Sequence, residues 1–282
     1  MVTARNRLVL PVIVCLAFLG GCAGATRVVH LTALDADLPS FSPAIRDYPE
    51  ALAAAASVIR DDFGLEARPV ALFLYPNRRE FEKGLIEAGG YSPAVAQAAV
   101  QYARAVGTLG KILVNEDGLA QAPWADRLSL LAHELTHVAQ FSLSGGVHGN
   151  SEQWLREGYA DWVSYQVVER LGLNSYRRLR NDLAARLVAA ARRGALPPLT
   201  DLSLFTDWNE IRDRRGGTVT YGVAFFAVEY LLQGRGPDAM AKYFRLFSSS
   251  PHRLINFRMA FGIDLDEFAK EFAQHFEKTV LR

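Results

Sequence analysis

The pattern of apolar and polar positions predicts a short strand-forming region that is embedded in a mainly helical chain. Apolar residues recur at helical spacing over 43–63, and a glycine follows where such a helix would end. Val70–Tyr75 is a run of β-branched and aromatic residues between two prolines, which predicts a strand. Residues 106–115 contain a second strand-forming run around Gly107 and Gly110, which predicts a hairpin or a bulged strand.

Further helices are predicted wherever apolar positions at helical spacing end at a glycine. The stretch 197–220 begins with two prolines and is expected to be irregular. This order favours an α+β fold, with a small N-terminal mixed β-sheet followed by a mainly α-helical region, in one domain over 43–282. The helices predicted after 43–63 are 80–88, 93–103, 126–143, 150–172, 175–193, 221–233, 238–247 and 264–281.

Residues 1–21 have the composition of an export signal and not of a folded domain. Arg5 and Arg7 precede an apolar run over 8–19, and small residues follow that run. A membrane-spanning helix needs about 20 apolar residues, so this run is too short to be one. We therefore expect the protein to be exported.

Two interpretations of the end of the signal stay open. Residues 23–25 fit an ordinary cleavage after Ala25. Leu19-Gly20-Gly21-Cys22 resembles the bacterial lipobox, in which the cysteine is lipidated and becomes the mature N-terminus. This resemblance implies a membrane-anchored lipoprotein of a bacterial cell envelope on its periplasmic face. Acyl chains on Cys22 would then anchor the protein without a spanning helix, and 22–42 would form its anchored N-terminus and tether.

Charge and cysteine content exclude several kinds of partner and site. The formal net charge is +1, and it becomes −1 when 1–21 and its two arginines are removed, so nothing indicates a nucleic-acid partner. The two cysteines are Cys15, within the signal, and Cys22. The domain over 43–282 therefore has no disulfide, no thiolate metal site and no cysteine nucleophile.

The sequence His133-Glu134-Leu135-Thr136-His137 lies within one predicted helix and is typical of a zinc site. The two histidines are four positions apart, so both imidazoles project from one helix face at a separation that a single Zn²⁺ can bridge. Glu134 lies about 100° around the helix from His133, where its carboxylate can reach a water on the metal without being a ligand. The chain has six histidines, so this spacing rarely arises by chance.

The next predicted helix offers the third protein ligand that such a site needs. Glu157 follows His137 by twenty residues, which is enough for a turn and an antiparallel return of the chain. The alternative is a surface glutamate on an amphipathic helix, but its apolar neighbours make an unpaired carboxylate costly and favour a ligand. Asp161 lies on the same helix face and could accept the free N–H of a ligand histidine. Gly158 allows another backbone to approach closely.

The segments HELTH and WLREGYAD together resemble those of the gluzincin metallopeptidases, and most of all the bacterial peptidase MA-like domains. The resemblance covers roughly 70–282 and is tight only over 130–162. It implies a zincin-like fold and places 106–115 at the sheet edge that pairs with an extended substrate. The chain lacks the Gly-x-Met-x-Asn segment with which aminopeptidases grip a substrate N-terminus, so endopeptidase and exopeptidase action both stay open.

Carried over residue by residue, the resemblance implies a Zn²⁺ cofactor that is bound by His133, His137 and Glu157. It also implies that Glu134 is the general base and that Asp161 is the partner of a ligand histidine.

Two residues are candidates for the donor that stabilises the oxyanion. Tyr221 lies where related enzymes carry a tyrosine with this role, and a phenol is a suitable donor to developing negative charge. The alternative for Tyr221 is packing at the start of a helix. His148, in the glycine-rich turn after the HELTH helix, is the second candidate, although a loop histidine without a role is the simpler interpretation.

The leading hypothesis is a zinc metallopeptidase that hydrolyses peptide or protein substrates at the cell envelope. The alternative is a non-enzymatic envelope lipoprotein, such as an assembly or scaffold factor with a vestigial metal site. Glu134 argues against this alternative, because a purely structural metal site needs no carboxylate beside it. A zinc hydrolase that acts on a non-peptide amide is a third possibility.

Overall fold

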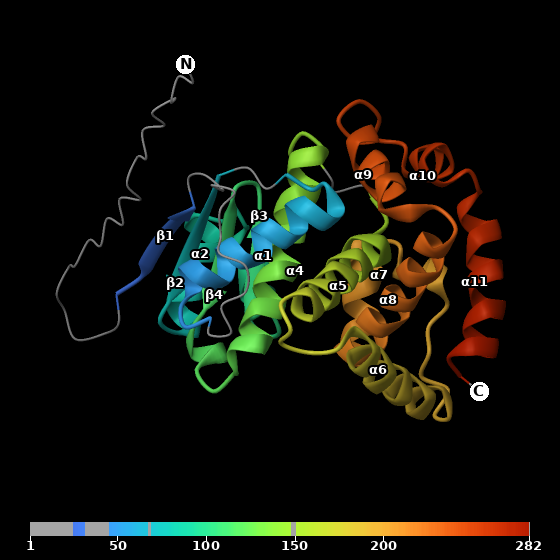
Figure 1. The fold of residues 1–282 in the computed structure, drawn as a ribbon, viewed down its shortest axis with the longest axis horizontal. Helices are drawn as coiled ribbons and strands as arrows, with labels where there is room; N and C mark the ends of the chain where they lie inside the picture. The colour runs from blue at the N-terminus through green and yellow to red at the C-terminus, as the bar shows by residue number, and fades with distance from the viewer. Residues whose placement is uncertain (1–24, 32–44, 67–68, 148–150, 282) are drawn as a thin grey trace, which may run out of the picture.

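A four-stranded mixed sheet lies at one end of the protein, and helices from the middle and the end of the chain make up the rest (Figure 1). The computed structural model describes residues 25–31, 45–66, 69–147 and 151–281. The arrangement confirms the predicted α+β class, with the sheet on the N-terminal side. The elements are β1 (Arg27–Leu31), α1 (Tyr48–Phe63), β2 (Val70–Tyr75), α2 (Arg78–Glu87), α3 (Pro93–Ala99), β3 (Ala105–Thr108), β4 (Lys111–Asn115), η1 (Asp117–Leu119), α4 (Trp124–Leu143), α5 (Gln153–Arg170), α6 (Tyr176–Ala191), η2 (Leu199–Leu202), α7 (Phe205–Arg215), α8 (Gly217–Gln233), α9 (Gly236–Leu246), α10 (Arg253–Phe261) and α11 (Leu265–Thr279).

The sheet has the strand order β1-β2-β4-β3, with β2 and β4 parallel at its centre and an antiparallel strand on each edge. β3 and β4 form a hairpin, which is one of the two possibilities expected over 106–115, and Gly110 adopts a positive φ of 69° in the turn between them. Side chains of β2 alternate between two cores. Three of them enter the main core with α1 and α4, whereas Phe73 and Tyr75 belong to a smaller core with α2 and α3.

Strand β1 departs from the expectation that 22–42 form a tether. All five of its residues pair with β2 in antiparallel register. In the sequence, its strand signal is limited to the β-branched pair Val28 and Val29. The main-chain hydrogen bonds of an edge strand depend little on side-chain type, so the neighbouring strand supplies the stabilisation that the local sequence does not reveal. The folded part of the chain therefore includes residues that we assigned to the tether.

The helices α7 and α10 were not predicted. α7 lies in the stretch 197–220 that we expected to be irregular, and its buried residues are Trp208, Ile211 and Arg212. A helix with so few apolar positions lacks the continuous apolar face by which an amphipathic helix is predicted from sequence. α10 was missed because apolar residues lie on its exposed side as well, including Leu254.

Three expectations fall outside the described residues. They are the export signal over 1–21, the lipidation of Cys22 and the oxyanion role of His148. Within the part of the chain that the structure describes, no helix combines the length and the apolar character that crossing a membrane requires.

Candidate metal centre

The structure brings His133 and His137 of α4 together with Glu157 of α5. The Nε2 atoms of the two histidines lie 3.0 Å apart, and each lies 3.4 Å from Oε2 of Glu157. Corners of a tetrahedron with metal–ligand bonds of 2.0–2.2 Å are roughly 3.3–3.6 Å apart. The three donor atoms are therefore spaced closely enough to bind one metal ion.

A hydrogen bond orients each of the three side chains. In each case the atom that could bind a metal is left pointing towards the other two side chains. Oδ1 of Asp161 lies 2.7 Å from Nδ1 of His133, which is the contact expected from the sequence. Nδ1 of His137 lies 2.9 Å from Oε1 of Gln140. A proton on each Nδ1 leaves the Nε2 lone pair free for a metal, so these partners fix the useful tautomer.

The third orienting contact holds the carboxylate of Glu157. The amide of Gln153 donates to Oε1 of Glu157 at 2.7 Å, which leaves Oε2 facing His133 and His137. Gln153 is the first residue of α5, and no side chain caps that end of the helix. A glutamine within a helix carries no sequence signal for this role, and the same is true of Gln140.

The charges around the triad favour a cation. The three side chains are 12–13% exposed, so solvent screens their interactions weakly. Burial lowers the pKa of His133, but the hydrogen bond and charge of Asp161 and the proximity of Glu157 outweigh it and raise that pKa well above its usual value. The charge and hydrogen bonds of the two histidines likewise outweigh burial at Glu157 and hold its pKa well below the usual range. The two carboxylates beside the histidines therefore favour a positive charge at the centre of the triad.

Glu134 lies beside the triad and is held by the sheet. Its side chain is buried, and Oε2 accepts a hydrogen bond of 2.5 Å from the backbone N–H of Gly107 in the edge strand β3. A Cβ atom at Gly107 would lie 2.3 Å from the carbonyl oxygen of Glu134, so only glycine allows this approach. Burial raises the pKa of Glu134, and the charges of His133 and His137 oppose that effect. The carboxylate is thus placed and tuned for accepting a proton.

Tyr221, near the start of α8, reaches the site from a third helix. Its ring lies 6.3 Å from that of His133, centroid to centroid, and it lines the same cavity as Glu134. Burial, followed by the charges of Glu157, Asp161 and Glu134, raises the pKa of Tyr221 well above its usual value. The phenol therefore stays protonated near neutral pH and can act as a donor.

Close contact between α5 and α8 brings Tyr221 near the metal ligands. At Gly158 an added Cβ atom would lie 2.3 Å from the carbonyl oxygen of Ala224 and 3.0 Å from Cγ2 of Val228. The expectation that Gly158 allows a backbone to approach closely is confirmed. Because Gly158 follows Glu157 directly, the helix contact and the metal ligand share one turn of α5.

A cavity of about 1060 Å³ contains the triad, Glu134 and Tyr221, and its walls come from β3 and from α3 to α8. Ligand pockets in proteins are typically about 300–1000 Å³, so this cleft accommodates a ligand at or above the upper end of that range. One wall of this cleft was not predicted from the sequence. It includes Tyr91, a loop residue whose pKa is raised to about 12 by burial, by Glu134 and by neighbouring groups.

Comparisons of the chain with protein-family models, with curated proteins and with solved structures found no match. We base the proposed function on the geometry of the site.

Proposed function

We propose that the protein is a zinc-dependent peptidase of the gluzincin type, with a zincin-like fold, which hydrolyses peptide bonds at the bacterial cell envelope. The position of Glu134 carries this proposal. The metal-binding group among the described residues has three donors, the number typical of catalytic zinc sites, whereas structural sites usually have four. A buried carboxylate beside such a group has a clear use in hydrolysis and none in a purely structural site.

Nitrogen and carboxylate donors without thiolate suit zinc, and the orienting contacts of both histidines are of the kind that zinc ligands have. When bound, zinc would act as a Lewis acid that polarises the substrate carbonyl and lowers the pKa of water to about 7.

In this proposal the residues of the chain carry out proton transfer, stabilisation of the oxyanion and orientation of the metal ligands. Glu134 accepts the proton of the attacking water and delivers it to the leaving amine. Its hydrogen bond from Gly107 fixes one carboxylate oxygen, which leaves the other for proton transfer. Tyr221 donates a hydrogen bond to the oxygen that becomes negatively charged. Asp161, Gln140 and Gln153 keep the three metal ligands in orientation.

The test compares the full-length wild-type protein with Glu134→Gln, a substitution that keeps size and removes the base. We expect both proteins to bind one zinc ion, measured by elemental analysis. We expect Glu134→Gln to hydrolyse a quenched-fluorescent peptide library about 10²–10⁴-fold more slowly, which is the usual contribution of a general base. Bound zinc without cleavage of any peptide by the wild type would count against a peptidase. Cellular function that survives Glu134→Gln would favour a scaffold.

A further inference from the structure

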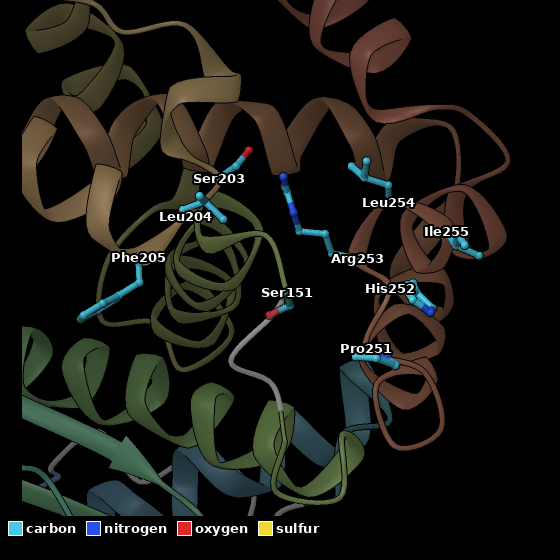
Figure 2. Close-up of a pocket in the computed structure, with 9 residues that line it drawn as sticks. All are labelled: Ser151, Ser203, Leu204, Phe205, Pro251, His252, Arg253, Leu254 and Ile255. Atoms are coloured by element: carbon cyan, nitrogen blue, oxygen red, sulfur yellow. The ribbon is translucent and has the colours of Figure 1, made fainter.

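A second cavity, of about 480 Å³, is lined by residues from the start of α7, the start of α10 and the segment before α5 (Figure 2). It lies between the start of α7, with Leu204 and Phe205, and the start of α10, with Leu254 and Ile255. Ser151 and Arg253 lie between these two sides in the close-up.

The two cavities share a wall. Phe205 lines both of them, and its side chain is 48% exposed. The segment that leads into α5 also links them, because Ser151 lines the second cavity whereas Gln153 and Glu157 line the cleft that contains the triad. The two cavities therefore adjoin at Phe205.

The lining of the second cavity favours an apolar occupant. Leu204, Phe205, Leu254 and Ile255 are 46–55% exposed, which is unusual for side chains of this size beside a cavity. The one guanidinium in the wall, that of Arg253, forms an ion pair with the fully buried carboxylate of Glu152. These two charges compensate each other, so the cavity offers no net charge to an ionic ligand.

The spacing along α5 suits a polypeptide. Gln153 and Glu157 are four residues apart within α5, which corresponds to roughly 6 Å along the helix axis. Ser151 precedes Gln153 by two residues outside the helix, and two residues of chain add at most about 7 Å. An extended polypeptide advances about 3.3 Å per residue, so roughly two to four residues separate a peptide bond at the metal site from a side chain in the second cavity.

We propose that the cavity between α7 and α10 is a distal substrate subsite, which binds an apolar side chain of an extended polypeptide roughly two to four residues from the bond at the metal site. This inference rests on the proposed peptidase function and makes it more specific: the substrate is a protein or a long peptide. A dipeptide would be too short to occupy both places.

The experiment measures binding and needs no catalysis, so it is separate from the test of peptidase activity. The probe is fluorescently labelled, reduced and carboxymethylated lactalbumin, a permanently unfolded polypeptide. Its dissociation constant is measured by fluorescence anisotropy with the full-length protein that carries Glu134→Gln and has been incubated with zinc. The test variant adds Leu254→Asp, and the matched control adds Met259→Asp. Both residues lie on α10 and are 53% and 54% exposed, but only Leu254 lines the cavity.

We expect Leu254→Asp to weaken binding by at least about tenfold, because burial of a leucine side chain corresponds to a factor of that order or more. Met259→Asp should leave the dissociation constant unchanged, and Leu254→Met should restore binding to within about threefold, since methionine fills a similar volume. Circular dichroism and thermal unfolding establish that all variants fold.

Three outcomes would overturn the proposal. The first is that the parent protein does not bind the unfolded polypeptide. The second is that Leu254→Asp and Met259→Asp bind it equally well. The third is that Leu254→Asp changes the oligomeric state, measured by light scattering, but leaves polypeptide binding intact. That result would show that this face is a contact between copies of the chain.

Discussion

Gln140 offers the sharpest test of how the metal site is organised. Its side chain is 1% exposed and makes two hydrogen bonds: Oε1 accepts from Nδ1 of His137 at 2.9 Å, and Nε2 donates to the carbonyl oxygen of Arg156 at 3.0 Å. It therefore joins a ligand on α4 to the turn of α5 that carries Glu157. The substitution Gln140→Met preserves the length of the side chain and removes both hydrogen bonds.

We expect Gln140→Met to weaken zinc binding by about 10–100-fold, which corresponds to about 1.4–2.7 kcal/mol, because His137 loses the partner that fixes its tautomer and ring orientation. The variant also leaves a buried N–H and a buried carbonyl without this partner, each at a cost of about 1–3 kcal/mol. Competition with a chromogenic chelator gives the dissociation constant of zinc, and thermal unfolding gives the loss of stability.

Gln140→Glu is the matched control for this prediction. A glutamate keeps an acceptor for His137, as Asp161 provides for His133, but it cannot donate to the carbonyl of Arg156. We expect Gln140→Glu to retain most of the zinc affinity while it loses stability. A zinc dissociation constant for Gln140→Met within threefold of the wild type, or equal affinities for the two variants, would refute an orienting role for Gln140.

Three further predictions concern the rest of the site. Tyr221→Phe should lower peptide hydrolysis by about 10²–10³-fold without a change in zinc affinity; a rate within threefold of the wild type would exclude the oxyanion role. Gly158→Ala should lower the free energy of unfolding by about 1–3 kcal/mol and weaken zinc binding, because its Cβ atom would lie 2.3 Å from a carbonyl oxygen of α8. Gly234→Ala is its control, since no neighbouring atom lies within 4 Å, and equal melting temperatures for the two variants would contradict the packing argument. Removal of zinc from protein that is held in free zinc at about 100 times the dissociation constant should cost about 2.7 kcal/mol, or a fall in Tm of roughly 5–10 °C. An unchanged Tm after verified metal loss would show that the site contributes nothing to stability.

Elements with a strong local pattern could be predicted from the sequence. The strand β2 and the helices α4 and α5 have clear apolar periodicity and glycine or proline boundaries, and the structure places them close to the expected positions. Strand β1 could not be predicted because it is short and depends on pairing with β2, which is distant in the sequence. Helix α7 could not be predicted because it has few apolar positions.

The same distinction applies to the site. The four-residue spacing of His133 and His137 is a local property of a helix, so their common direction could be read from the sequence. The contact of Glu134 with Gly107 joins segments twenty-seven residues apart, and it depends on how the sheet edge lies against α4. Gln140 and Gln153 lie three and four residues from the ligands that they contact, but they were missed because a glutamine in a helix has many possible partners. Only the bond from Gln140 to the carbonyl oxygen of Arg156 depends on the packing of α4 against α5.

The walls of the cleft and the metal-binding residues belong to different parts of the fold. The donors and their partners come from α4 and α5, whereas α3, α6 and α7 contribute surface to the cleft but no donor. Selectivity for a substrate can therefore be altered by substitutions on α3, α6 or α7 while the reactive groups keep their positions. Under the proposed function, such a division makes the protein a suitable starting point for changing which polypeptides are recognised independently of how their bonds are broken.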